Sequence, residues 1–181
     1  MRRRRLIPLA LCLVCVLLLT SCAPRELTEK DLRLGPLRLG MTDAELEKVM
    51  GQPATTEKRK TIGYNYQFNT GPDSILRVMT DDKGAFAITL LRVSEGLKGT
   101  PSLVSAKELR TPRGIALGVS ETIARKKYGP SAHDYPGYYY KLLVGGAPAD
   151  WRLLQFTVEN GFVTGIHLTM SSIGWNDEEP D

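Results

Sequence analysis

Two histidines, His133 and His167, are the only side chains that normally ionise near neutral pH, so acid–base or metal chemistry would involve them first. An imidazole acts as a general base or a metal ligand when a carboxylate or a second ligand stands at a suitable spacing. His133 precedes Asp134 in a segment rich in proline and glycine, and His167 lies in an apolar alternating run. Neither forms an H-x-x-x-H or H-E-x-x-H pattern. We therefore expect two exposed histidines, no metal site and no enzyme activity.

Ser120 is the serine whose surroundings come nearest to a nucleophile. The G-x-S-x-G elbow needs a second glycine two residues after the serine, and this chain has Thr122 there. Ser120 precedes an amphipathic segment, where a serine caps a helix. A calcium loop would need further oxygen ligands and a distal glutamate. We therefore expect ordinary turns at the acidic and amide residues Asp81, Asp82, Glu159 and Asn160.

The first 21 residues have the composition of an export signal. Four arginines precede an apolar run at 6–19, which is short for a membrane-spanning helix. Cys12 and Cys15 lie inside this run, so their C-x-x-C spacing indicates neither a redox nor a zinc site. The four arginines are the only charged residues before Cys22, which leaves 20 basic side chains against 20 acidic ones. This balance argues against nucleic acid as a partner.

Leu19-Thr20-Ser21-Cys22 resembles the bacterial lipobox. The resemblance implies transfer of a diacylglyceryl group to the sulfur of Cys22, cleavage before Cys22 and acylation of the new amine. Two or more acyl chains make a stable anchor, because each buried methylene contributes about 0.8 kcal/mol. We therefore expect a lipoprotein signal peptide at 1–21 and lipidation at Cys22, with no cofactor beyond these chains. The expected location is extracytoplasmic, anchored to a bacterial cell membrane, which is the outer membrane in some hosts. An ordinary secreted protein is the alternative.

A short helix is predicted twice, at 39–51 and, 78 residues later, at 117–129. Thr42 and Glu45 form a T-x-x-E capping box at the first helix, and Ser120 is the expected cap of the second. A glycine ends each helix, where a left-handed conformation is favoured. Apolar spacing places the buried sides at Met41, Leu46, Val49 and Met50, and at Ile123, Ala124 and Tyr128.

Runs with a period of two follow each helix and predict antiparallel strands. They cover 62–68, 75–80 and 86–90, then 138–144, 153–158 and 162–170. The predicted fold class is α+β, with two tandem repeats, each a short helical element packed on a three- or four-stranded antiparallel sheet. The expected units are a tether at 22–36, repeats at 37–95 and 114–172, a junction at 96–113 and an acidic tail at 173–181. One face of the last strand should carry Phe162, Thr164, Ile166, Leu168 and Met170.

Aromatic residues on the strands suggest a surface for a partner. Three tyrosines are consecutive at 138–140, so at least one of them must face away from the main core. Tyrosine and tryptophan are favoured at interfaces because they bury a large area and keep a polar group. Half-buried sheet residues are the alternative for each of them. The predicted partner-binding residues are Tyr64, Tyr66, Tyr138, Tyr139, Tyr140 and Trp151.

Several of these motifs resemble the SmpA/OmlA (BamE-like) lipoprotein domain and the related fold of beta-lactamase inhibitor protein, which has two tandem copies. The resemblance rests on Gly40-Met41-Thr42, Val49-Met50-Gly51-Gln52-Pro53, the aromatic strand and Asp81-Asp82-Lys83-Gly84, and it covers 37–93 and 115–170. It implies helices on one face of an antiparallel sheet, with the other face or the edges free for a protein partner. We therefore expect a membrane-anchored, non-catalytic protein-binding or envelope-assembly module whose partner is an envelope or secreted protein. An inhibitor of a secreted or envelope hydrolase is the alternative.

Overall fold

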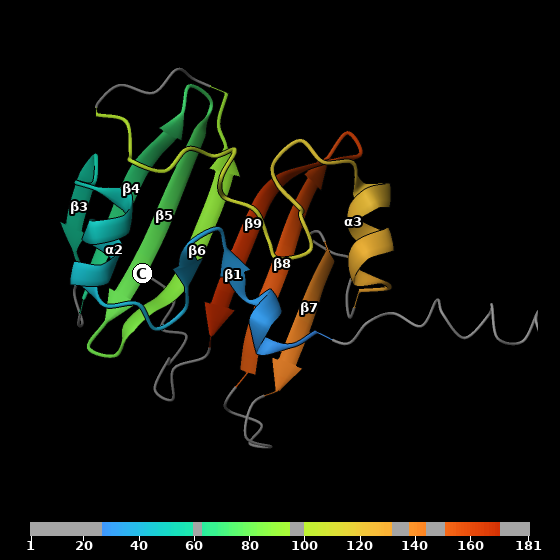
Figure 1. Cartoon of the computed structure of the whole chain (residues 1–181), viewed down its shortest axis with the longest axis horizontal. Coiled ribbons are helices and arrows are strands. Elements are labelled where there is room, and N and C mark those ends of the chain that lie inside the picture. The colour runs from blue at the N-terminus through green and yellow to red at the C-terminus, as the bar shows by residue number, and fades with distance from the viewer. Residues whose placement is uncertain (1–26, 60–62, 95–99, 132–137, 144–150, 171–181) are drawn as a thin grey trace, which may run out of the picture.

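The computed structural model describes residues 27–59, 63–94, 100–131, 138–143 and 151–170 of the 181-residue chain. Cys22, the leader, His133 and the acidic tail lie outside these residues. Seven strands form one antiparallel sheet in the order β3-β4-β5-β6-β9-β8-β7, and β1 and β2 form a separate two-stranded ribbon (Figure 1). No helix in the described ranges has the length and apolar character needed to cross a membrane. The elements are η2 (Glu29–Asp31), β1 (Arg33–Leu34), β2 (Leu37–Arg38), α2 (Asp43–Met50), β3 (Thr55–Lys58), β4 (Tyr64–Gly71), β5 (Ser74–Asp81), β6 (Gly84–Arg92), α3 (Glu121–Tyr128), β7 (Tyr138–Leu143), β8 (Trp151–Glu159) and β9 (Phe162–Met170).

The predicted fold class, α+β with two tandem repeats, is wrong: the described chain is mostly β, and the strands β3 to β9 from both halves join in one seven-stranded sheet. The junction is an antiparallel pairing of β6 with β9, from Ala87 opposite Thr169 to Leu91 opposite Gly165. A half that folded alone would leave each of these strands as an open edge with unpaired backbone groups. Their pairing removes both edges. The two halves also share one core, because Ile88, Leu90, Ile166 and Leu168 are fully buried across the junction.

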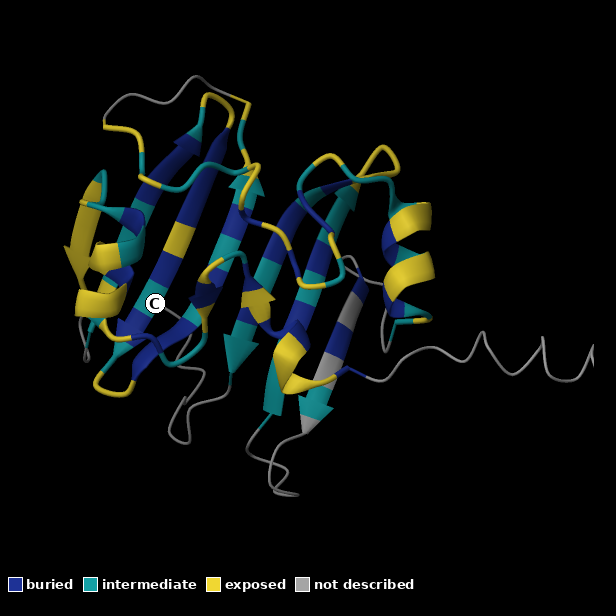
Figure 2. Ribbon diagram, viewed as in Figure 1, coloured by how far each residue is buried: buried dark blue, intermediate teal, exposed yellow. Residues whose placement is uncertain are grey.

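One face of the sheet is covered mostly by irregular backbone (Figures 1 and 2). The helices α2 and α3 lie near the two ends, with the β1–β2 ribbon and the segment 100–120 between them. A helix of eight residues is about 12 Å long, whereas seven strands span about 29 Å. Extended segments must therefore complete the cover. Their fully buried contributions to the core are Leu34, Leu37, Leu109 and Ile115.

The segment from Leu27 to Leu34 belongs to the fold, although the sequence placed it in a tether. Leu27, Leu32 and Leu34 are all buried in the core cluster. Asp31 in η2 pairs with Arg113, with 2.7 Å between Oδ1 and Nε, and the two side chains are only 9% and 12% exposed. A buried ion pair thus fastens the N-terminal segment to Arg113, 82 residues further along the chain.

Helices α2 and α3 begin with different hydrogen bonds. Thr42 Oγ1 accepts a bond from the Glu45 amide at 3.2 Å, and the Glu45 carboxylate accepts one from the Thr42 amide at 2.9 Å. The capping box is confirmed. Ser120 stands at the N-cap of α3, as predicted, but its side chain makes no capping bond to the described residues, so the expected stabilisation by a cap is wrong. Gly51 and Gly129 end the helices at φ of 79° and 80°, as predicted.

This difference gives a first prediction. We expect Thr42→Ala to lower the free energy of unfolding by about 1 kcal/mol, because a helix amide loses its partner. Ser120→Ala should change it much less, since it removes no capping bond. Urea unfolding of both variants, followed by circular dichroism, measures the two effects. Equal losses would show that Ser120 caps α3 in solution.

Three local features differ from the predicted pattern. Ile123 is 50% exposed on α3 instead of buried. A register shift between Thr157 and Val158 turns the start of β9, so that Val163 is buried and Phe162 is 50% exposed. The prediction of Phe162 on the inner face is therefore wrong. The structure also contains β3, an exposed edge strand that was not predicted because its residues are all polar and show no apolar alternation.

Candidate functional site

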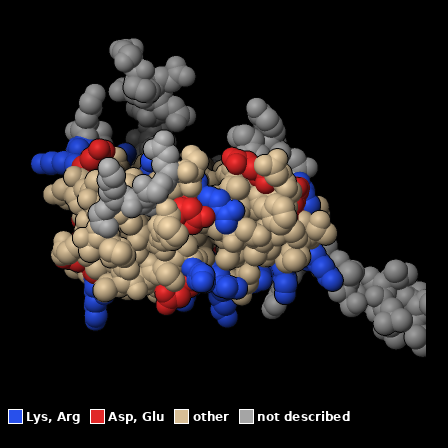
Figure 3. All heavy atoms as spheres, turned by 90° about the horizontal axis from the view of Figure 1, so that it is seen from above, with Lys and Arg blue, Asp and Glu red and all other residues tan. Residues whose placement is uncertain are grey.

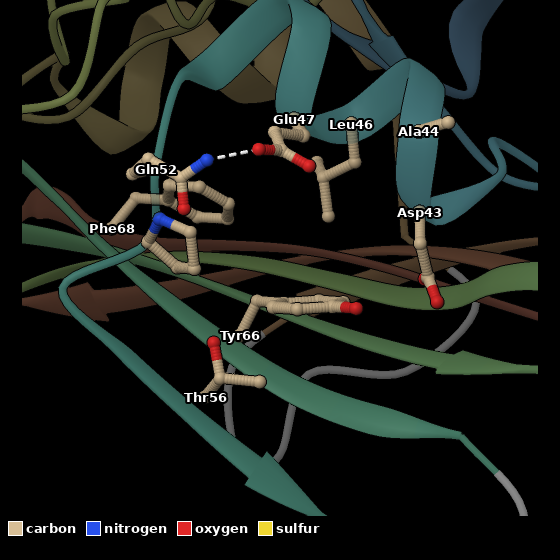
Figure 4. A pocket seen from close by; sticks show the side chains of 9 residues that line it. Asp43, Ala44, Leu46, Glu47, Gln52, Thr56, Tyr66 and Phe68 are labelled. Carbon is tan, nitrogen blue, oxygen red and sulfur yellow. Dashed lines mark hydrogen bonds between the residues drawn. The ribbon is translucent and has the colours of Figure 1, made fainter.

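A pocket of about 260 Å³ lies between α2 and the β3–β4 edge of the sheet (Figure 4). The Tyr66 ring forms its floor, and Leu46 points down from the helix. The helix is held over the strand because Leu46 and Met50 are buried in the core, while its other side is exposed. The lining residues are Asp43, Ala44, Leu46, Glu47, Gln52, Pro53, Thr56, Tyr66 and Phe68.

The pocket is negatively charged. Asp43 and Glu47 stand four residues apart on α2, and none of the nine lining side chains is basic. Glu47 accepts a hydrogen bond from the Gln52 side-chain amide (Figure 4). Asp43 Oδ1 is buried and accepts no hydrogen bond from the residues that the structure describes. A buried oxygen of this kind carries the cost of lost hydration without a compensating partner.

The Tyr66 hydroxyl lies on the side of the ring nearest Asp43 (Figure 4). Burial raises the pKa of Tyr66 to about 12, and the negative charge of Asp43 and the contact of the Tyr66 hydroxyl with the Asp43 carboxylate add to this rise. Tyr66 is therefore neutral at physiological pH. The arrangement offers a ring face and two carboxylates to whatever enters the pocket, which suits a positively charged group.

The predicted partner-binding residues do not form one patch. Tyr64, which is 37% exposed, and Tyr66 are neighbours on β4, with 5.8 Å between their ring centroids. Trp151 begins β8 and is half-buried. Strands β4 and β8 are four positions apart in the sheet, about 19 Å. Of the predicted residues whose side chains the structure describes, Tyr66 lines the pocket and Tyr64 lies beside it.

Two of the tyrosines on β7, Tyr138 and Tyr140, are part of the core. Tyr138 and Tyr140 are buried and pack with Tyr128 and Phe156 beneath α3, with ring centroids 5.2–6.1 Å apart. They present no surface to a partner. The backbone of Tyr139 lies in β7, but its side chain is outside the described part of the chain.

The sequence-based search missed Asp43, Glu47 and Gln52. Asp43 had a sufficient explanation as an acidic residue at the positive end of a helix dipole. Gln52 was named only within the Val49-Met50-Gly51-Gln52-Pro53 motif of the resemblance, and Glu47 was assigned no role. The available signal was the spacing of two acids on one helix face, but only the packing of α2 on β4 shows what lies opposite them.

The sheet face away from the helices carries a row of polar side chains. The strand register places one polar residue on each of β4, β5, β6, β9 and β8, side by side: Gln67, Arg77, Thr89, His167 and Gln155. Seen from above, the molecule carries basic and acidic side chains interspersed over its surface (Figure 3). No group of three or more His, Cys, Asp or Glu side chains within the described ranges could hold a metal ion.

His167 is half-buried in this row, so the prediction of an exposed side chain is wrong for it. Its Nε2 lies 2.9 Å from Thr157 Oγ1, and its Nδ1 lies 3.3 Å from Thr89 Oγ1. Gly165 leaves room for the ring, since a Cβ there would come within 2.9 Å of Nε2. Burial lowers the pKa of His167 from its usual value, which favours the neutral ring.

A pH dependence of stability follows from this shift. The unfolded chain binds a proton at His167 with a pKa near 6.5, above that of the folded state, so stability falls as pH drops from about 6.5 through the folded pKa. We expect the urea concentration at the unfolding midpoint to change less with pH in His167→Gln than in wild type, between about pH 8 and pH 5. His133→Gln is the matched control and should keep the wild-type slope. An unchanged slope in His167→Gln would contradict the prediction.

Comparisons with known proteins identify no family for this chain. No protein-family model matches it, and no curated protein matches. A solved structure with a similar arrangement is an extracellular protein containing an SCP domain from Bacillus anthracis str. Ames, with 11% sequence identity and a TM-score of 0.46. The match covers 81% of this chain and 49% of the other, so this chain spans about half of that protein. A likeness of this size indicates neither family nor activity.

Proposed function

We propose that this protein is a non-catalytic protein-binding or envelope-assembly module of the SmpA/OmlA (BamE-like) type, anchored by acyl chains on Cys22 outside a bacterial cell membrane. The pocket beside α2 is the observation that supports binding. In it, a buried carboxylate oxygen of Asp43, which has no hydrogen-bond partner among the described residues, lies near the Tyr66 ring at an edge of the sheet, and the exposed Tyr64 lies alongside. The arginine-rich leader and the Leu19-Thr20-Ser21-Cys22 motif support the anchor.

The anchor is tested by metabolic labelling with an alkyne fatty acid. We expect label on the wild-type protein and none on Cys22→Ser, because the thiol is the point of diacylglyceryl attachment. Cys12→Ser and Cys15→Ser should keep the label, since both residues lie within the leader. Equal labelling of Cys22→Ser would contradict lipidation at this position.

The binding surface is tested by photo-cross-linking in intact cells. A photoreactive residue placed at Tyr64, beside the pocket, should give a discrete adduct with an envelope or secreted protein. The same residue at Arg77, exposed on the opposite face, is the control. An adduct at position 77 alone would move the interface to the other face, and no adduct at position 64 would contradict the proposal. Capture of a hydrolase, with loss of its activity on titration, would instead favour the inhibitor function.

A further inference from the structure

Helix α3 has a counterpart of the α2 pocket. The two helices have eight residues each and lie 78 residues apart, so Asp43 corresponds to Glu121 and Glu47 corresponds to Arg125. Each helix also ends at a glycine with almost the same dihedral angles, φ and ψ of 79° and −162° at the first and 80° and −163° at the second. The helix positions can therefore be compared residue by residue.

The strands beneath the helices correspond as well. Tyr66 on β4 stands opposite Val78, and Tyr138 on β7 stands opposite Phe156. Val78 and Phe156 are again 78 residues apart. Tyr66 and Tyr138 thus occupy equivalent places, each on the strand below the first turns of a helix.

A cation occupies this place at α3. The Arg125 guanidinium carbon lies 4.6 Å from the centroid of the Tyr138 ring, and Arg125 Nε lies 2.7 Å from Glu121 Oε1. A carboxylate at the first helical position and a tyrosine ring on the strand therefore hold a guanidinium between them. The two contacts combine a charge-assisted hydrogen bond with a cation–π interaction.

The α2 pocket has the same carboxylate and ring without the cation. Glu47 replaces the arginine, which reverses the charge at that position. Asp43 Oδ1, the counterpart of an oxygen that is paired at α3, is buried and unpartnered within the described chain. The space between Asp43, Glu47 and Tyr66 is open (Figure 4). The guanidinium of Arg125 at α3 therefore indicates the kind of group that would fill the α2 pocket.

We propose that the α2 pocket binds a guanidinium or primary ammonium group between Asp43 and the Tyr66 ring, and that an arginine or lysine side chain of a partner protein supplies it. The proposal that the pocket binds a cation rests on the geometry of the site. The proposal that a partner protein supplies this cation rests on the proposed function. A hollow of about 260 Å³ lies below the range of about 300–1,000 Å³ that is usual for drug-sized ligands. A single side chain therefore suits the pocket better than a larger molecule.

The chemistry is tested by titrating the full chain in detergent micelles with N-acetyl-arginine amide and N-acetyl-lysine amide. N-acetyl-norleucine amide is the uncharged control. We expect saturable shifts in the backbone NMR signals of α2 with the two cations only. Asp43→Asn should weaken binding about tenfold or more, because a hydrogen bond to a charged group is lost. Glu57→Gln removes one negative charge from β3, outside the pocket lining, and should bind like wild type.

Glu47→Arg provides an independent test that does not depend on a loss of folding. It places in α2 the cation that α3 already has, so we expect it to fill the pocket, prevent binding of both probes and raise the melting temperature. Unchanged binding in Asp43→Asn and Glu47→Arg, or no binding of either probe to wild type, would overturn the site. Shifts caused by Mg²⁺ or Ca²⁺ but by neither probe would overturn it too.

The cross-link from position 64 separates this inference from the proposed function. Loss of the partner adduct in the Glu47→Arg background supports a partner side chain as the source of the cation. Probe binding with an unchanged adduct would overturn that source and point to a free amine. An adduct that persists while both probes fail would leave the proposed function standing and overturn the inference.

Discussion

Arg113→Ala lowers the free energy of unfolding by about 3–5 kcal/mol, because it leaves the Asp31 carboxylate buried without its partner. The pair is bidentate, with Arg113 Nε 2.7 Å from Oδ1 and Nη2 2.8 Å from Oδ2. The guanidinium also lies 4.5 Å from the centroid of the Tyr128 ring. Chemical unfolding at neutral pH measures the loss.

Arg38→Ala is the matched control for this prediction. Arg38 pairs with Glu45 at 3.0 Å, but both side chains are 46% exposed, so its removal should cost at most about 1 kcal/mol. Equal losses in the two variants would show that the Asp31 pair contributes no more than a surface pair.

The Asp31 pair also has an expected pH signature. Burial alone would raise the pKa of Asp31, but the hydrogen bonds from Arg113 and Thr28 and the charge of Arg113 outweigh it and lower the pKa below its usual value. The resulting stabilisation is complete above the unfolded pKa of about 3.9 and is lost as pH falls through the folded pKa. We expect this acid-sensitive component to be missing in Arg113→Ala.

Leu168→Ala at the centre of the sheet is expected to cost about 2–5 kcal/mol, because it leaves a cavity at a fully buried position. Leu168 on β9 stands opposite Ile88 on β6 and Leu154 on β8, so it packs across the junction of the two halves. If the sheet is one cooperative unit, amides in β5 and β8 should lose protection from hydrogen exchange together.

Native-state hydrogen exchange with urea unfolding measures this effect. Leu103→Ala removes a leucine that is exposed, and it should leave both halves unchanged. Loss of protection in β7–β9 alone, with β4 and β5 unaffected, would contradict a single unit and indicate two separately stable halves.

Local structure was readable from the sequence where the signal is local. Period-two runs predicted six of the seven strands of the main sheet, and caps and glycines located both α-helices. The pairing of β6 with β9 joins residues more than 70 positions apart, and an apolar strand looks the same at an edge or in the middle of a sheet. The fold class was wrong for this reason: the prediction treated each half as complete.

The site was only half visible for a similar reason. Tyr64 and Tyr66 were predicted as binding residues because aromatic side chains are common at interfaces. Asp43 was explained by its place at the positive end of a helix dipole and Glu47 was assigned no role, and their relation to Tyr66 exists only after α2 packs on β4. The sequence shows that Glu47 in the first helix corresponds to Arg125 in the second, at the offset of 78 residues. The consequence for binding becomes clear only when the structure places a tyrosine ring beside each position.

The buried Asp31–Arg113 ion pair fixes the segment that follows Cys22, and it therefore limits the distance between the folded domain and the membrane if Cys22 is anchored in lipid. Cys22 lies five positions before Leu27, where the packed structure begins, and five fully extended steps along the chain reach at most about 18 Å. Glu29 is bound to Arg152 on β8, so this end of the sheet must stay close to the lipid headgroups. The α2 pocket opens over β4, four strand spacings or about 19 Å along the sheet from β8. A lipid anchor at Cys22 would therefore restrain one end of the molecule and leave the acidic pocket at the other end.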